Sequence, residues 1–187
     1  MKLHTLIIAT ALTASVCSAQ TTTAPANTLG EWFAGTSFGQ FTNTDTSEGD
    51  VDLNLYTLHL GRNLDQQLLG CDLASYFEVG YLDVNGRNSR IVPFTLNLAA
   101  ERELCCGVKG YATGGIGYAF SNVDADPGSN GSGGFYAQTS LGLSYDVNES
   151  WEIYGGARYL FLDNVEYGAE LSVDNNVGYE VGLRYNF

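Results

Sequence analysis

The last eleven residues, VGYEVGLRYNF from Val177 to Phe187, alternate strictly between two kinds of side chain. Successive side chains of a β-strand point to opposite sides, so one face carries only aliphatic and aromatic groups. The other face carries the charged Glu180 and Arg184 among glycine and asparagine. This stretch therefore predicts a terminal strand with one face suited to an apolar environment and the other suited to polar neighbours.

The same two-residue rhythm recurs along the chain between clusters of Gly, Asn, Asp and Ser, which are typical of turns. It appears in eight runs, none with helical spacing, at approximately residues 31–41, 53–62, 73–83, 92–103, 108–121, 135–147, 151–162 and 176–187. The connections after the first, third, fifth and seventh runs are long, whereas those after the fourth and sixth are short. The connection after the second run, about ten residues, fits this scheme least well. The pattern predicts an all-β fold, an eight-stranded antiparallel up-and-down barrel with two unlike ends.

Residues 1–19 have the features of a secretory signal peptide: a basic residue near the start, an apolar stretch, and small residues before Gln20. We therefore expect residues 1–19 to be cleaved, residues 20–30 to form a flexible N-terminal segment, and residues 31–187 to form one barrel domain. After residue 19, no apolar stretch reaches the roughly 18 residues that a membrane-spanning helix needs. The formal net charge of −13 argues against nucleic acid as a partner.

The polar faces of the runs indicate which side of the barrel meets lipid. They are rich in Gly, Ser and Thr and carry few charges near their middles, which suits a narrow lumen that side chains fill. A soluble lipocalin-like carrier, the alternative, would point its large apolar side chains inward around a ligand. The apolar faces end in aromatic groups, as expected at the two interfaces of a membrane. The pattern thus favours a transmembrane barrel with Trp151, Tyr185 and Phe187 near the short-turn end and Tyr118, Phe120 and Phe161 near the long-loop end.

The chain after residue 19 resembles the small outer-membrane β-barrel proteins of diderm bacteria, a group that includes the OmpA transmembrane domain and OmpX. Its ending, YEVGLRYNF, is similar to the C-terminal insertion signal of that family, in which the assembly machinery reads a terminal aromatic residue and alternate apolar residues before it. The resemblance implies an integral outer-membrane protein, surrounded by membrane lipid and assembled with the barrel assembly machinery and periplasmic chaperones. We expect a monomer without a cofactor. The residues that match the signal are Tyr179, Val181, Leu183, Tyr185 and Phe187.

Charges inside a barrel are costly unless they are paired, so the inward-facing ones are expected to meet one another. Arg158 lies seven residues after Trp151, and Glu180 lies seven residues before Phe187 on the neighbouring strand, which places the two at similar heights. Lys109 similarly follows the turn after two glutamates. The predicted lumen ion pairs involve Arg158, Glu180, Lys109, Glu101, Glu103, Glu78 and His59.

The sequence predicts no catalytic or metal site. His59, the one histidine after residue 19, is followed by Leu60 and Gly61 and so lacks the His-x-Ser spacing of lipid A deacylases. No positioned nucleophile accompanies it. The acidic loop sequence DADPGSNGSGG lacks the later bidentate Glu of an EF loop. We interpret the acidic loops as solvated surface, with divalent-cation bridging to anionic lipid or to a partner as a weaker alternative.

These features predict a structural or surface-interaction role in the outer membrane, with a lumen plugged by polar side chains. The alternative is a porin-like, narrow channel for small solutes. The sequence identifies no surface partner for the first role and no solute for the second.

Three cysteines follow the signal peptide, and the strand assignment sends all of them to the short-turn end. Cys71 precedes the third run, and Cys105 and Cys106 form the turn after the fourth. Neighbouring antiparallel strands bring these positions together if the register agrees, and the periplasm is oxidising. We therefore predict a disulfide between Cys71 and either Cys105 or Cys106, with the third thiol free.

Overall fold

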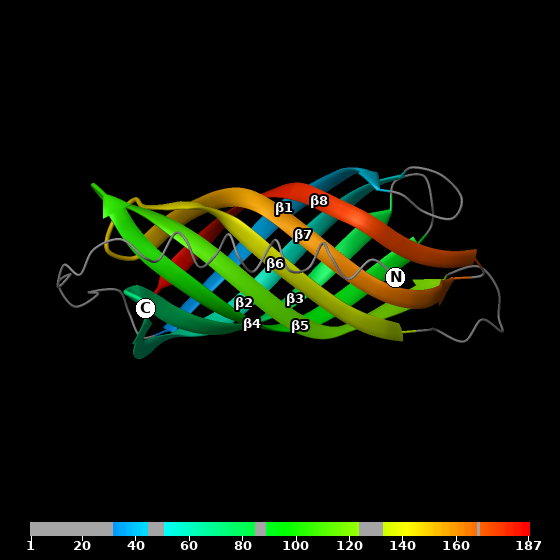
Figure 1. Ribbon diagram of the computed structural model, residues 1–187, viewed down its shortest axis with the longest axis horizontal. Coiled ribbons are helices and arrows are strands. Elements are labelled where there is room, and N and C mark those ends of the chain that lie inside the picture. Colours follow the sequence, from blue (N-terminus) through cyan, green and yellow to red (C-terminus); the bar gives the residue numbers. More distant parts are fainter. Residues whose placement is uncertain (1–31, 45–50, 85–88, 124–132, 168) are drawn as a thin grey trace.

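The computed structural model describes residues 32–44, 51–84, 89–123, 133–167 and 169–187. Each strand pairs antiparallel with the next, and the last pairs with the first, so the sheet is a closed barrel (Figure 1). This architecture confirms the fold class predicted from the alternation. The eight strands are β1 (Trp32–Thr44), β2 (Val51–Leu68), β3 (Cys71–Val84), β4 (Ser89–Cys105), β5 (Val108–Val123), β6 (Gly133–Asp146), β7 (Trp151–Tyr167) and β8 (Ala169–Asn186).

The barrel closes between β1 and β8. Their register runs from Phe33 opposite Asn186 to Phe41 opposite Gly178. Just outside it, the Phe187 N–H donates to Trp32 O at 2.9 Å, and the Trp32 N–H donates to Phe187 O at 3.3 Å. Closure leaves no unpaired strand edge along this seam, which a barrel in lipid requires.

Three tight turns lie at the end of the barrel that holds the C-terminus, which we call the short-turn end (Figure 1). Positive φ angles at Leu69 and Gly70, and at Cys106 and Gly107, are those of type I′ turns, which match the twist of a two-residue hairpin. In the third turn, Asn148 Oδ1 accepts hydrogen bonds from the N–H groups of Ser150 and Trp151, both at 2.9 Å. The opposite end is called the long-connection end below.

Three strands, β2, β7 and β8, are much longer than the sequence pattern predicted. β2 continues to Leu68, so the connection of about ten residues expected after the second run is wrong, and a two-residue turn replaces it. The register between β2 and β3 shifts between Leu64 and Gln67, and this irregularity interrupts the alternation that marks a strand. β7 and β8 likewise extend to Tyr167 and Ala169, through most of the fourth predicted loop.

The two faces of the sheet differ as the alternation predicted. Aromatic side chains contact one another on the outer face, including Trp151 with Tyr185 near the short turns and Tyr118 with Phe120 toward the other end, both at 4.9 Å between ring centroids. In the part of the chain that the structure describes, no helix is long and apolar enough to cross a membrane. The predicted signal peptide and residues 20–31 lie outside the described residues. Exposed outer residues between the aromatic groups include Leu58, Leu60, Leu96, Leu98, Ile116, Leu143, Ile153 and Val181.

Candidate functional site

The middle of the lumen is organised around Arg158, whose side chain is almost wholly buried. Arg158 Nη1 lies 2.9 Å from Glu180 Oε2, and Nη2 forms an ion pair with Glu78 Oε1. Glu78 comes from β3, Arg158 from β7 and Glu180 from β8, so the guanidinium spans the interior rather than joining neighbouring strands only. The attraction between the guanidinium and the carboxylates offsets part of the free energy that is lost when these charges are removed from water.

Gln138 on β6 extends this cluster to β4. Its Nε2 donates to Glu78 Oε1 at 2.8 Å and to Asn97 Oδ1 at 2.7 Å, while its Oε1 accepts from Arg158 Nη2. Tyr111 adds a hydrogen bond from its hydroxyl to Glu180 Oε1 at 3.1 Å. Buried polar groups with several partners of this kind restrain one another, so the centre of the lumen is cross-linked from β3 to β8. We call Arg158, Glu78, Glu180, Gln138, Asn97 and Tyr111 the central cluster.

An aromatic layer lies on the short-turn side of the central cluster. His59 is ringed by Phe33, Tyr76 and Tyr154, with centroid distances of 5.5 to 6.1 Å. Tyr154 also meets Tyr111 edge-on at 5.8 Å. Inward glycines make space for these rings, since a Cβ at Gly142 would stand 2.7 Å from the Tyr111 hydroxyl. The aromatic layer therefore consists of Phe33, His59, Tyr76, Tyr111 and Tyr154, which contact one another inside the lumen.

A second charged cluster lies at the short-turn end. Arg184 Nη1 is 2.7 Å from Glu101 Oε1, and Lys109 Nζ is 2.7 Å from Asp146 Oδ1. Glu152 lies between the two cations, 3.3 Å from Arg184 and 3.5 Å from Lys109. Arg184 also stacks over the Phe33 ring at 4.6 Å, which ties this cluster to the aromatic layer. We call these five charged residues the mouth cluster.

The lumen toward the long-connection end is apolar, which the sequence analysis missed. The prediction of a lumen filled by polar side chains is therefore wrong at this end of the barrel. The inward face of β7 continues from Arg158 into Leu160, and that of β4 continues from Thr95 toward Ile91, all of them buried. A cluster of buried apolar residues lies at this end of the lumen. It consists of Phe41, Leu53, Leu55, Leu82, Ile91, Ala119, Tyr136, Leu160 and Leu162.

The structure places most of the predicted lumen charges inside, with different partners for some. Glu103 is exposed at the end of β4, so its assignment to the lumen is wrong because the strand runs beyond the barrel wall there. Lys109 meets Asp146 and Glu152 rather than Glu101. His59 faces inward but contacts aromatic rings, and no ion pair of His59 occurs among the contacts of the described residues.

The predicted disulfide from Cys71 to Cys105 or Cys106 is wrong, because Cys105 and Cys106 are both free thiols. The register between β3 and β4 pairs Asp72 with Glu101, so Cys71 stands opposite Arg102. Cys105 lies three residues further along β4, roughly 10 Å at the rise of a strand. A disulfide tolerates a Cα separation of at most about 6.8 Å.

Alkylation tests this arrangement of thiols. In the folded, oxidised protein, Cys105 and Cys106 should both react with a maleimide without denaturant, because both are exposed and adjacent cysteines rarely bridge each other without strain. Peptide mapping under non-reducing conditions measures the labelling. Recovery of either residue linked to Cys71 would contradict the register of β3 and β4.

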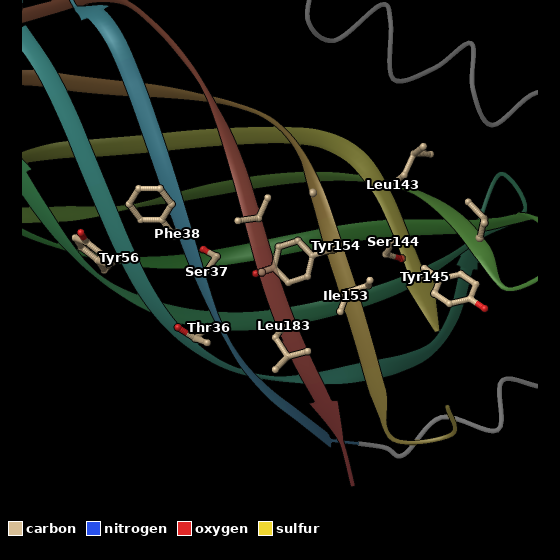
Figure 2. Close-up of a pocket in the computed structure, with 14 residues that line it drawn as sticks. Thr36, Ser37, Phe38, Tyr56, Leu143, Ser144, Tyr145, Ile153, Tyr154 and Leu183 are labelled. Atoms are coloured by element: carbon tan, nitrogen blue, oxygen red, sulfur yellow. The ribbon is translucent and has the colours of Figure 1, made fainter. Parts of the chain in front are cut away.

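A hollow on the barrel wall beside β6, β7, β8 and β1 contains no charged side chain among the described residues that line it (Figure 2). Its outer lining is apolar, with Phe38, Ile153 and Leu183, and Tyr154 and Ser144 contribute from the inner side of the sheet. Within the described ranges, no group of three or more His, Cys, Asp or Glu side chains is placed to hold a metal ion. Among the described residues, the buried charged side chains face the lumen.

Comparison with solved structures supports the same architecture. The chain resembles Neisserial surface protein A (NspA) with a TM-score of 0.68 at 16% identity, over 83% of this chain and 97% of that one. The fold is that of the small outer-membrane barrels. The N-terminal β-barrel domain of Pseudomonas aeruginosa OprF matches with a TM-score of 0.54 at 12% identity, over 85% and 99% of the two chains. OprG from the same organism matches with a TM-score of 0.51 at 16% identity, over 85% and 97%. No family model and no curated protein matches the sequence.

Proposed function

We propose that this protein is an integral outer-membrane barrel that does not conduct solutes and has a structural or surface-interaction role. Its apolar outer face and aromatic groups suit a bilayer, and the shared fold supports the same location. The proposal includes a cleaved signal peptide, a monomeric state, and assembly from the periplasm with the short turns on that side. Membrane lipid is the partner that the outer face fits.

The observation that carries the non-conducting role is the link that Arg158 forms across the lumen. Its guanidinium binds Glu78 and Glu180 from separate parts of the wall, with the apolar cluster on one side and the aromatic layer on the other. Eight strands enclose an interior just wide enough for side chains to fill. Opening a path for ions would require breaking buried ion pairs and separating packed rings, both of which are unfavourable.

A catalytic role has little support in this geometry. His59 is the histidine of the barrel, and its ring packs against Phe33, Tyr76 and Tyr154. A general base needs a nucleophile or a water-accessible substrate within hydrogen-bond reach, and aromatic rings supply neither. We therefore propose that the protein is not an enzyme.

Planar bilayer recording tests the proposed closed lumen. Purified barrel reconstituted in a bilayer should give no stable conductance steps beyond those of heat-denatured protein, because the lumen is occupied at three successive heights. A porin recorded under the same conditions shows that the assay detects channels. Reproducible unitary steps from the folded protein would instead support the alternative, a narrow channel for small solutes.

A further inference from the structure

Buried polar atoms without a hydrogen-bond partner in the protein gather at the short-turn end of the lumen. They are Ser144 Oγ, Glu152 Oε1, Arg184 Nε, and both Asn186 Nδ2 and Oδ1. All four residues are at most 7% exposed, and Glu152 is fully buried. Elsewhere in the described residues, such atoms occur singly, on His59, Tyr136 and Arg158. A buried polar atom without a partner costs free energy, so this concentration points to something bound among them.

The register holds these atoms close together. Ser144 lies on β6, Glu152 on β7, and Arg184 and Asn186 on β8, which are successive strands. Glu152 pairs directly with Arg184 across β7 and β8. The set combines donors, acceptors and a hydroxyl that does both, which is the mixture that water satisfies.

The same region has an excess of negative charge. Three carboxylates, on Glu101, Asp146 and Glu152, face two cations, on Lys109 and Arg184. Each cation stands 2.7 Å from its closer carboxylate but 3.3 Å or more from Glu152. Glu152 is therefore the carboxylate with the weakest compensation, and its Oε1 accepts no hydrogen bond although it lies 3.3 Å from Arg184 Nη1.

The region is open on one side and closed on the other. The Asp146 side chain is 27% exposed, so solvent reaches the mouth cluster from the short-turn end. In the opposite direction, the Tyr154 ring packs against Tyr111 and His59 and separates the mouth cluster from Arg158. The space therefore ends at the aromatic layer.

We propose that the short-turn end of the lumen is a hydrated, blind-ended vestibule that admits water and small cations. It is lined by Ser144, Glu152, Arg184 and Asn186, and the excess carboxylate favours cations over anions. The vestibule opens toward the periplasm if the short turns lie on that side, as the proposed function has it. The hydration and the cation preference depend only on the contacts of these residues.

Thiol accessibility tests the vestibule. A background protein carries Cys71→Ser, Cys105→Ser and Cys106→Ser, and single cysteines are then introduced. Ser144→Cys and Asn186→Cys probe the vestibule, and Gln138→Cys probes the central cluster beyond the aromatic layer. Ser144→Cys replaces a hydroxyl with a thiol of similar shape, and heat-modifiable migration on gels confirms that each variant is folded. Each folded variant in detergent micelles is treated with a methanethiosulfonate that carries either a quaternary ammonium or a sulfonate.

Ser144→Cys and Asn186→Cys should be modified, whereas Gln138→Cys should stay unmodified over the same time. At the two vestibule positions, the ammonium reagent should react about tenfold faster than the sulfonate reagent, because the local negative charge concentrates cations. Raising the salt concentration should reduce this difference through screening.

Three results would contradict parts of the inference. If Ser144→Cys and Asn186→Cys are as unreactive as Gln138→Cys, the short-turn end is dry and the vestibule does not exist. The proposed non-conducting role would be unaffected, because the bilayer recording tests it separately. If the two reagents react equally fast, the cation preference is wrong. A third result, in which Gln138→Cys reacts as fast as the others, would refute the blind end and would also count against the proposed non-conducting role.

Discussion

Replacing Arg158 with methionine should lower the free energy of unfolding of the barrel by about 3–5 kcal/mol. The substitution removes the guanidinium that binds Glu78 and Glu180 but leaves both carboxylates buried. An uncompensated buried charge costs more than the ion pair itself contributes. Urea unfolding of the protein from lipid micelles, followed by tryptophan fluorescence, measures the loss.

The same cluster predicts a rescue that requires three substitutions. Arg158→Met combined with Glu180→Leu still leaves Glu78 without its guanidinium, so stability should recover only in part. Adding Glu78→Gln removes the last charge and should recover most of the loss, since an apolar or neutral replacement of a whole buried ion pair is often nearly neutral. Glu103→Gln is the matched control, because the same chemical change at an exposed position should alter stability little. Losses that add across the three positions would show that these groups do not act as one cluster.

The division of the barrel into two faces could be predicted from alternation alone, because the side-chain period of a strand has only one possible value. In β7, Trp151 and Ile153 point outward and Glu152 points inward, as the pattern indicated. Strand ends were harder to predict. At the end of β2 the shift between Leu64 and Gln67 breaks the period while the backbone pairing continues. The local sequence pattern shows where side chains alternate, but hydrogen bonding between strands determines how long each strand is.

The pairing register between neighbouring strands was the feature hardest to predict from the sequence. Counting residues from the turns placed Arg158 and Glu180 at similar heights on the neighbouring strands β7 and β8. The structure agrees, because Arg158 Nη1 lies 2.9 Å from Glu180 Oε2. The same counting placed Cys71 beside Cys105, yet β4 extends three residues past the position opposite Cys71. Glu78 lies across the lumen from Arg158, and contacts through the interior depend on the stagger of every intervening strand.

Deleting Phe187, or replacing it with serine, should reduce the folded barrel in the outer membrane to a small fraction of the wild-type amount while export continues. The motivation is the resemblance of the terminal strand to an insertion signal, with Phe187 as its final aromatic residue. In the folded barrel the Phe187 side chain is 60% exposed and stacks on Tyr185 at 6.2 Å, so the interior loses no packing with it. Heat-modifiable migration of membrane fractions on gels measures assembly, and the unassembled protein should appear in the periplasm or be degraded.

Two comparisons separate recognition of the terminal strand from stability of the barrel. Phe187→Ser keeps the backbone hydrogen bonds to Trp32, so purified protein should still refold in detergent with near wild-type yield. Trp32→Ser removes an exposed aromatic side chain from the facing strand at the same seam, and it should assemble in cells far better than Phe187→Ser. If Phe187→Ser fails equally in detergent and in cells, ordinary packing at the seam between β1 and β8 explains the defect. If it assembles normally in cells, the terminal aromatic residue is not read as a signal in this chain.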